Sequence, residues 1–112
     1  MESWDSGRAL DSVGGDVQFL NELAGIFCAA CPTLLKSLEE STAAKDLKGA
    51  ADTAHLLASA ARSLAASRAA EMALTIEAMA RRAEFEGIES ACHSLRQEVE
   101  QLADQLKKFR TG

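Results

Sequence analysis

The chain has 112 residues, enough for one domain with a modest core and too few for two. A net charge of −5 argues against a nucleic acid partner, because a phosphate backbone attracts a basic face. Alanine is the commonest residue and tyrosine is absent, which suits closely packed helices and argues against a sheet. Three cysteines without a secretion leader predict free thiols and a cytoplasmic location. No apolar run approaches the roughly 20 residues that cross a bilayer, so no membrane is expected as a partner.

A short helix is predicted at about residues 5–13, with Asp5 or Ser6 as its N-cap and Gly14-Gly15 after it. Asp16 is the N-cap expected for a second helix, from Val17 to about Thr42. Its apolar residues step by three and four, which predicts one buried face. They are Leu20, Leu23, Ala24, Phe27, Cys31, Leu34, Leu35 and Leu38.

Pro32 falls inside this second helix. It removes one backbone hydrogen bond and crowds the carbonyl of Cys28, so a kink or a local break is expected there.

The third predicted helix runs from Leu47 to about Leu64, after Asp46 as its N-cap. Helical spacing divides it into two opposite stripes. The polar stripe is Lys48, Asp52, His55, Ser59 and Arg62; the apolar one is Leu47, Ala50, Ala51, Ala54, Leu57, Ala61 and Leu64. His55 is therefore expected on the solvent side of a helix whose other side is packed.

A fourth helix is predicted from Ser67, as its N-cap, to a point before Gly87. The last helix, from Ile88 to Phe109, alternates four and three in its apolar spacing, which is typical of a helix packed along its neighbours. The fold expected is all-α: an antiparallel up-down-up-down four-helix bundle over about residues 16–110, with the short N-terminal helix, in a single domain of residues 1–112.

Several motifs resemble the histidine-containing phosphotransfer (HPt) family, and the resemblance covers nearly the whole chain. The matching positions are Val13-Gly14-Gly15-Asp16, Phe27, Pro32, Leu38, Asp46, Ala54-His55, Leu57, Ala60, Leu64, Ala66 and Ile76-Glu77. The resemblance implies a module that accepts a phosphoryl group from a receiver-domain aspartate on His55 and passes it on. It implies a phosphocarrier without independent catalytic activity, and a monomer with a response-regulator receiver or a hybrid histidine kinase as partner. No cofactor of its own is implied, because the receiver supplies the magnesium.

The chain departs from the family pattern at three positions after the histidine. The family has His-x-Leu-Lys-Gly, whereas Ala58 and Ser59 stand here at the lysine and glycine positions, and Ala65 replaces a later glycine. Ser59 is small enough to leave the imidazole accessible, but the lysine charge is lost. The alternative is therefore an HPt-like module that binds a receiver or kinase without transferring phosphate. A structural helical bundle that self-associates is a third possibility.

Three side chains are expected to support His55: the small Ser59, which leaves the ring accessible, and Arg62 and Glu77, which act on it directly. Arg62 lies seven residues later on the same helix face and partly replaces the lysine in our hypothesis, because helical side chains lean toward the N-terminus. Glu77 aligns with a family position near the histidine, where it would accept a bond from the ring Nδ1–H and leave Nε2 free. Solvated surface side chains are the alternative for both, and the preferred interpretation for Asp52.

The receiver is expected to dock over the exposed side of the third helix. The docking residues predicted are Leu56, Ser59, Arg62 and Ser63. An apolar Leu56 beside the histidine favours this, since transient docking needs some apolar contact.

Cys28-Ala-Ala-Cys31 with Cys92-His93 is a weak zinc pattern. Consecutive helical residues point about 100° apart, so Cys92 and His93 cannot easily share one ion, and no metal is predicted. Arg81-Arg82 is interpreted as a solvated helix end.

Overall fold

The computed structural model describes residues 4–111, and within that range every regular element is a helix. The helices are α1 (Ser6–Ser12), α2 (Val17–Ala43), α3 (Leu47–Ser63), α4 (Ser67–Arg81) and α5 (Ile88–Thr111). The all-α prediction is confirmed, and each predicted helix is present within a few residues of its expected bounds.

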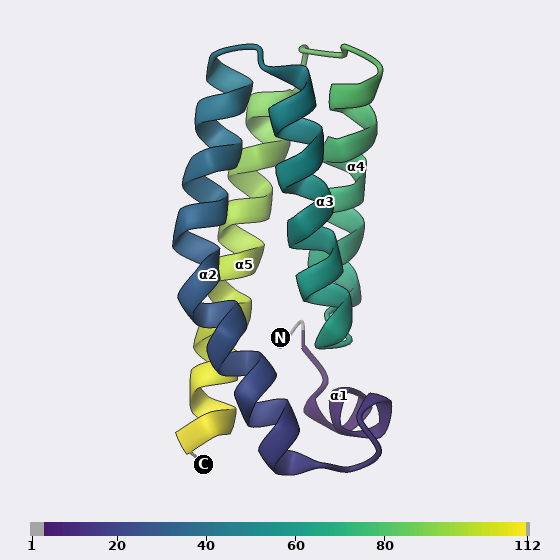
Figure 1. Cartoon of the computed structure of the whole chain (residues 1–112), viewed down its shortest axis with the longest axis vertical. Coiled ribbons are helices and arrows are strands. Elements are labelled where there is room, and N and C mark those ends of the chain that lie inside the picture. The colour runs from purple at the N-terminus through teal and green to yellow at the C-terminus, as the bar shows by residue number, and fades with distance from the viewer. Residues whose placement is uncertain (1–3, 112) are drawn as a thin grey trace.

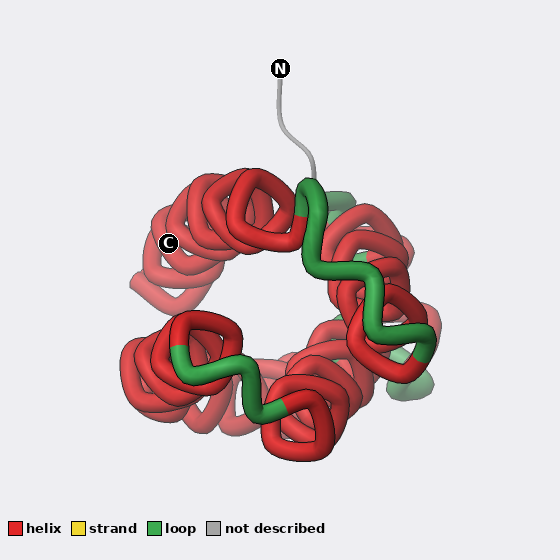
Figure 2. The backbone as a smooth tube through the Cα atoms, turned by 90° about the horizontal axis from the view of Figure 1, so that it is seen from above, coloured by secondary structure: helices red, strands yellow, loops and turns green. Residues whose placement is uncertain are grey.

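The four long helices lie side by side around a shared core, seen end-on in Figure 2. In Figure 1, α2 leads from the lower to the upper end of the molecule, α3 returns, α4 ascends and α5 comes back down. The short α1 lies at the lower end, beyond the end of α3. The molecule is elongated as a result, measuring 40 × 24 × 20 Å.

Alanines dominate the buried sides of α3 and α4, two helices that pack on each other. On α3, Ala50, Ala51, Ala54, Ala58 and Ala61 are buried, and on α4, Ala69, Ala70, Ala73 and Ala80 are buried. The distance between packed helices depends on the side chains at the contact, so small residues on both sides let the two backbones approach closely. This close approach allows a side chain of α4 to reach one on the outer side of α3.

Each of α2, α3 and α4 ends in a turn that places a non-glycine residue in the left-handed region. Lys45, Ala65 and Ala83 occupy it, with φ values of 57°, 55° and 57°. The next amide closes each turn on a carbonyl five residues back, as in the 2.9 Å bond from Ala66 N to Ala61 O. The second of these turns, at Ala65, starts α4 differently from the prediction. Ala66 is the N-cap residue, without a side-chain bond, and Ser67 is the first residue of the helix.

Asp5, Asp16 and Asp46 cap α1, α2 and α3 as predicted. Each carboxylate accepts a bond from the backbone N–H three residues later, at 3.0–3.1 Å. The cap at Asp46 fixes the start of the helix that carries His55.

Pro32 does not break α2, which is continuous from Val17 to Ala43. Figure 1 shows the N-terminal part of α2 bending away from the line of its upper part, as expected when one intrahelical bond is lost. By length and composition alone, α2 would be able to cross a membrane: an 18-residue window has a mean hydropathy of 1.3, with 22% of it buried. The sequence prediction had found no such run. Core helices pass the same test, and α2 contributes six buried residues to the bundle.

Trp4 ties the start of the chain to the lower end of the bundle. Its indole Nε1–H donates to the Leu64 carbonyl at 2.8 Å, and its backbone N–H donates to Gln105 Oε1 at 3.0 Å. The ring meets the Phe109 ring edge-on at 5.5 Å and is buried. One residue thus holds the C-terminal end of α3 and the last turns of α5 together.

Candidate functional site

His55 stands on the outer side of α3, near the middle of the helix. Its side chain is 58% exposed, so water and a partner can reach the ring. The other members of the predicted polar stripe, Lys48, Asp52, Ser59 and Arg62, are exposed as well. The buried residues of α3 lie on the opposite side and fix the helix against its neighbours.

Glu77 reaches His55 from α4. Its Oε1 lies 3.2 Å from the ring Nδ1, and its own side chain is only 14% exposed. A carboxylate is an acceptor only, so the ring nitrogen that faces it must carry the hydrogen. The contact therefore selects the form of a neutral imidazole in which Nδ1 is protonated and Nε2 has its lone pair free.

Arg81 holds the other oxygen of the same carboxylate. Its Nε and Nη2 donate to Glu77 Oε2 at 3.0 and 2.7 Å. These bonds lower the pKa of Glu77; the bond to His55 adds to that effect, while desolvation opposes it. Glu77 is thus ionised at neutral pH, with one oxygen for each partner.

Arg81 and Arg82 form the exposed end of α4, as predicted, with side chains that are 57% and 63% exposed. The pairing of Arg81 with Glu77 was not predicted. The signal was present in the spacing, since a glutamate four residues before an arginine on one helix commonly forms an ion pair.

The predicted docking residues all lie on the exposed side of α3. Leu56 is 56% exposed beside the histidine, and Ser59, Arg62 and Ser63 are exposed too. Ser63 Oγ also donates to the Ala60 carbonyl at 2.7 Å. The structure therefore leaves this surface, with one apolar and several polar side chains, open around His55.

Ala58, at the position where the family carries its lysine, is only 1% exposed. It belongs to the buried side of α3, so the polar stripe skips it. Asp52 forms an ion pair with Lys48 at 3.8 Å and faces solvent, as expected for a surface residue.

The second histidine, His93, is exposed on α5. Near it, Arg96 donates to both oxygens of Glu39 on α2, each at 2.7 Å, and lies 3.6 Å from Glu100. These bonds from Arg96 lower the pKa of Glu39, against a smaller effect of desolvation.

The three cysteines are unpaired. Cys31 and Cys92 are buried, and burial raises the pKa of Cys31 to about 12, which keeps the thiol neutral in the core. Among the described residues, no three histidine, cysteine or acidic side chains come together as ligands of one ion.

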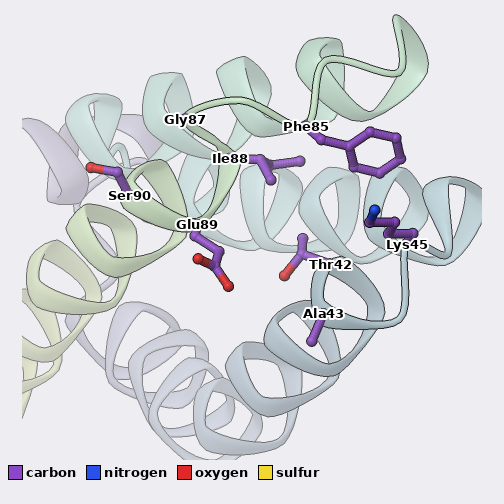
Figure 3. A pocket seen from close by; sticks show the side chains of 8 residues that line it. All are labelled: Thr42, Ala43, Lys45, Phe85, Gly87, Ile88, Glu89 and Ser90. Atoms are coloured by element: carbon purple, nitrogen blue, oxygen red, sulfur yellow. The ribbon is translucent and has the colours of Figure 1, made fainter.

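A hollow of about 370 Å³ lies at the upper end of the bundle, where the α2–α3 and α4–α5 connections meet (Figure 3). Lys45 stands over the Phe85 ring there, with Nζ 5.4 Å from the ring centre. The residues that line the hollow are Thr42, Ala43, Lys45, Phe85, Gly87, Ile88, Glu89 and Ser90. His55 and Glu77 are not among these residues, so the hollow is separate from the histidine site.

Comparison with protein families agrees with the all-helical fold. The model of the Hpt domain family matches residues 22–105, three quarters of the chain. The chain belongs to this family, whose members are phosphocarrier modules of two-component signalling and interact with receiver domains and kinases. The comparison with curated proteins gives no match, and neither does the comparison with solved structures.

Proposed function

We propose that this domain accepts a phosphoryl group on His55 Nε2 from the aspartyl phosphate of a receiver domain and passes it to a second aspartate. The observation that carries the proposal is the contact between Glu77 Oε1 and His55 Nδ1 at 3.2 Å on a ring that is otherwise exposed. It turns the reactive nitrogen outward with its lone pair free.

The transfer needs no base on this chain. The Nε2 lone pair forms a bond to phosphorus while the bond from phosphorus to the aspartate oxygen breaks, and the electron pair of that bond leaves with the carboxylate. The Nδ1 proton stays in place, so the ring gains a positive charge as it takes the phosphoryl group. The Glu77 carboxylate faces that charge and stabilises it, in the manner of a preorganised electrostatic partner.

The partner supplies the rest of the chemistry in this proposal. The receiver brings its aspartate and its magnesium ion and docks over the open face of α3, in contact with Leu56, Ser59, Arg62 and Ser63. Either a free response regulator or the receiver of a hybrid histidine kinase fits this role. The protein works as a monomer in the cytoplasm, and its unpaired thiols agree with a reducing compartment.

Arg62 contributes a cation to the phosphorylated state. The lysine position of the family is occupied by the buried Ala58, and Arg62 lies on the exposed stripe two turns after His55. Its long side chain leans toward the N-terminus of α3 and reaches a phosphoryl oxygen with charge-assisted bonds.

The direct test is to mix the protein with phosphorylated receivers from the same organism and measure the phosphate transferred to the chain. Phosphohistidine is labile in acid and stable in base, whereas aspartyl phosphate is lost in base. We expect base-stable, acid-labile phosphate on His55 and none on His55→Gln. If no receiver transfers phosphate while at least one binds, the domain is a binding module without transfer activity.

The role of Arg62 is tested with Arg62→Ala, with Arg68→Ala as the control. Arg68 is an exposed arginine on α4 that pairs with Glu98 at 3.3 Å. We expect Arg62→Ala to slow transfer roughly threefold, the equivalent of a weak exposed charge pair, and to shorten the phosphohistidine lifetime. If the transfer rate and the phosphohistidine lifetime of Arg62→Ala equal those of Arg68→Ala, Arg62 has no role in transfer.

A further inference from the structure

The Glu77 carboxylate acts on His55 in two opposite ways. By holding the Nδ1 proton it exposes the Nε2 lone pair, which transfer requires. As a negative charge beside the ring it also favours the imidazolium form, in which Nε2 is protonated and cannot attack phosphorus. A carboxylate without a partner cation would therefore orient the ring but also reduce the fraction of the ring that is neutral and able to react.

Arg81 stands where it can separate these two effects. Both of its bonds go to Oε2, so Oε1 remains with the imidazole, and the guanidinium places a positive charge against the oxygen that the ring does not use. The orientation of the ring is kept while the field of the ion pair at the ring is smaller than that of the carboxylate alone. The closeness of the pair also holds Glu77 in the ionised form.

We infer that Arg81 is a positioning residue that offsets the Glu77 charge, so that His55 is oriented by a carboxylate without being protonated by it. The inference rests on the proposed function of His55 and deepens it. It assigns a role to an arginine of α4 that neither touches the ring nor lies on the docking helix.

The other charges around His55 do not supply this balance. Asp52 and Lys48 on α3 offset one another through their ion pair, and both face solvent. Arg62 lies two turns further along α3. Within residues 4–111 no ion pair from α2 or α5 reaches the ring, so Glu77 and Arg81 are the charges of the packed neighbours that face it.

The test is an NMR titration of the two histidine rings in the full chain, comparing the wild type with Arg81→Gln. We expect the pH at which half of the His55 ring is protonated to rise by about half a unit, the effect of losing a unit charge several ångströms away near water. His93 is an internal reference in the same spectrum and its midpoint should not move. The spectrum also reports whether the variant is folded.

The matched control is Arg82→Gln, which removes the same charge one residue later. Arg82 pairs with Glu84 at 2.7 Å instead of with Glu77. Arg81→Lys keeps the charge but not the paired bonds, and should restore the wild-type midpoint. The inference is overturned if His55 moves no more than His93, if Arg82→Gln has the same effect, or if Arg81→Lys behaves as Arg81→Gln.

A second readout is phosphorylation of His55 by phosphoramidate, a small donor that needs no docking. In acid, where both rings are mostly protonated, the Arg81→Gln rate should fall by up to about threefold, in proportion to the lost neutral ring. In alkali, where both rings are neutral, it should be no lower than the wild-type rate, because the unscreened Glu77 carboxylate stabilises the charge that forms on the ring. An equal loss at all pH values would contradict the inference. The titration itself needs no transfer, so a wild type that titrates as expected but takes no phosphate from any receiver refutes the proposed function and leaves the charge balance standing.

Discussion

The two histidine faces of this bundle contain the same three residue types in different arrangements. On the α3/α4 face, Arg81 gives both bonds to one oxygen of Glu77, and the other oxygen meets the His55 ring. On the α2/α5 face, Arg96 gives one bond to each oxygen of Glu39, so both oxygens already have a strong donor. His93 stands nearby without such a partner for its ring in the described structure.

The difference shows that having a histidine, a glutamate and an arginine on neighbouring helices is not enough for the glutamate to bond the histidine ring. What matters is which oxygen the guanidinium occupies. Arg81 and Glu77 share one helix at a spacing of four, which brings the arginine to the carboxylate from one side. Arg96 approaches Glu39 from another helix and can use its planar fork on both oxygens.

The largest effect expected from this comparison is on phosphate uptake from a receiver. His55→Gln should abolish it, because Nε2 of His55 is the acceptor, and His93→Gln should leave it unchanged. Acid-labile phosphate on each variant after incubation with a phosphorylated receiver measures both. Label that persists in His55→Gln and disappears in His93→Gln would reverse the assignment of the two faces.

The next effect concerns the carboxylates. Glu77→Ala should reduce transfer roughly tenfold, the equivalent of about 1.4 kcal/mol for a lost hydrogen bond to the reacting ring. It should also shift the neutral His55 ring away from the Nδ1–H form, which NMR of the ring nitrogens detects. Glu39→Ala is the matched control and should change neither. An unaltered tautomer in Glu77→Ala would remove the orienting role.

For the free energy of unfolding, the order of the two carboxylates should be reversed, with Glu39 mattering more than Glu77. Glu39→Gln should lower the free energy of unfolding at pH 7 by about 1 kcal/mol, because Glu39–Arg96 joins two helices and both side chains are partly shielded from water. Glu77→Gln should cost about half of that, since its arginine is on the same helix.

The pH dependence of this effect follows from the lowered pKa of Glu39. A depressed pKa means stability that is present above the ordinary value of 4.5 and is lost as pH falls through the folded-state pKa. The difference between wild type and Glu39→Gln should therefore shrink in acid and vanish once Glu39 is protonated. Urea unfolding at several pH values measures it, and a difference that grows in acid would contradict the assignment.

The smallest effect concerns the turn at Ala65, which joins α3 to α4. The α2/α5 face has no equivalent, because α2 and α5 are not consecutive in the chain. Ala65 holds φ at 55°, a region that costs non-glycine residues roughly 1–2 kcal/mol. Ala65→Gly should therefore stabilise the bundle by about 0.5 kcal/mol after the entropy cost of glycine. Ala29→Gly, in the exposed middle of α2, should destabilise it by about 1 kcal/mol. Thermal unfolding that shows the same sign for both would refute the strain at Ala65.

Much of this arrangement could be predicted from the sequence. Apolar steps of three and four located all four long helices, and the aspartates at positions 16 and 46 marked two of the starts. The expected neighbourhood of Glu77 and His55 came from the family resemblance, since the spacing of 22 residues says nothing by itself about contact across two helices.

Other features depend on tertiary contacts that one-dimensional patterns do not contain. Arg81 is exposed at the end of α4 as predicted, but its pairing with Glu77 was not, because two adjacent arginines say nothing about the carboxylate that lies between α4 and α3. Ser67 has the preferred chemistry of an N-cap, yet the left-handed Ala65 set the start of α4 one residue earlier. Pro32 was compatible with a break, and the packed face of α2 kept the helix whole.

The contacts of Trp4 with α3 and α5 make its indole an intrinsic fluorescence probe. With one tryptophan and no tyrosine in the chain, ultraviolet emission comes from a single indole, which is buried against Leu64 and Phe109. Leu64 and Trp4 are buried, whereas the docking residues of α3, up to Ser63, are exposed, so a receiver seated over the histidine need not disturb the signal. A red shift of the emission would report that the N-terminal segment has detached from the bundle. This event can thus be followed separately from events at the phosphorylation site.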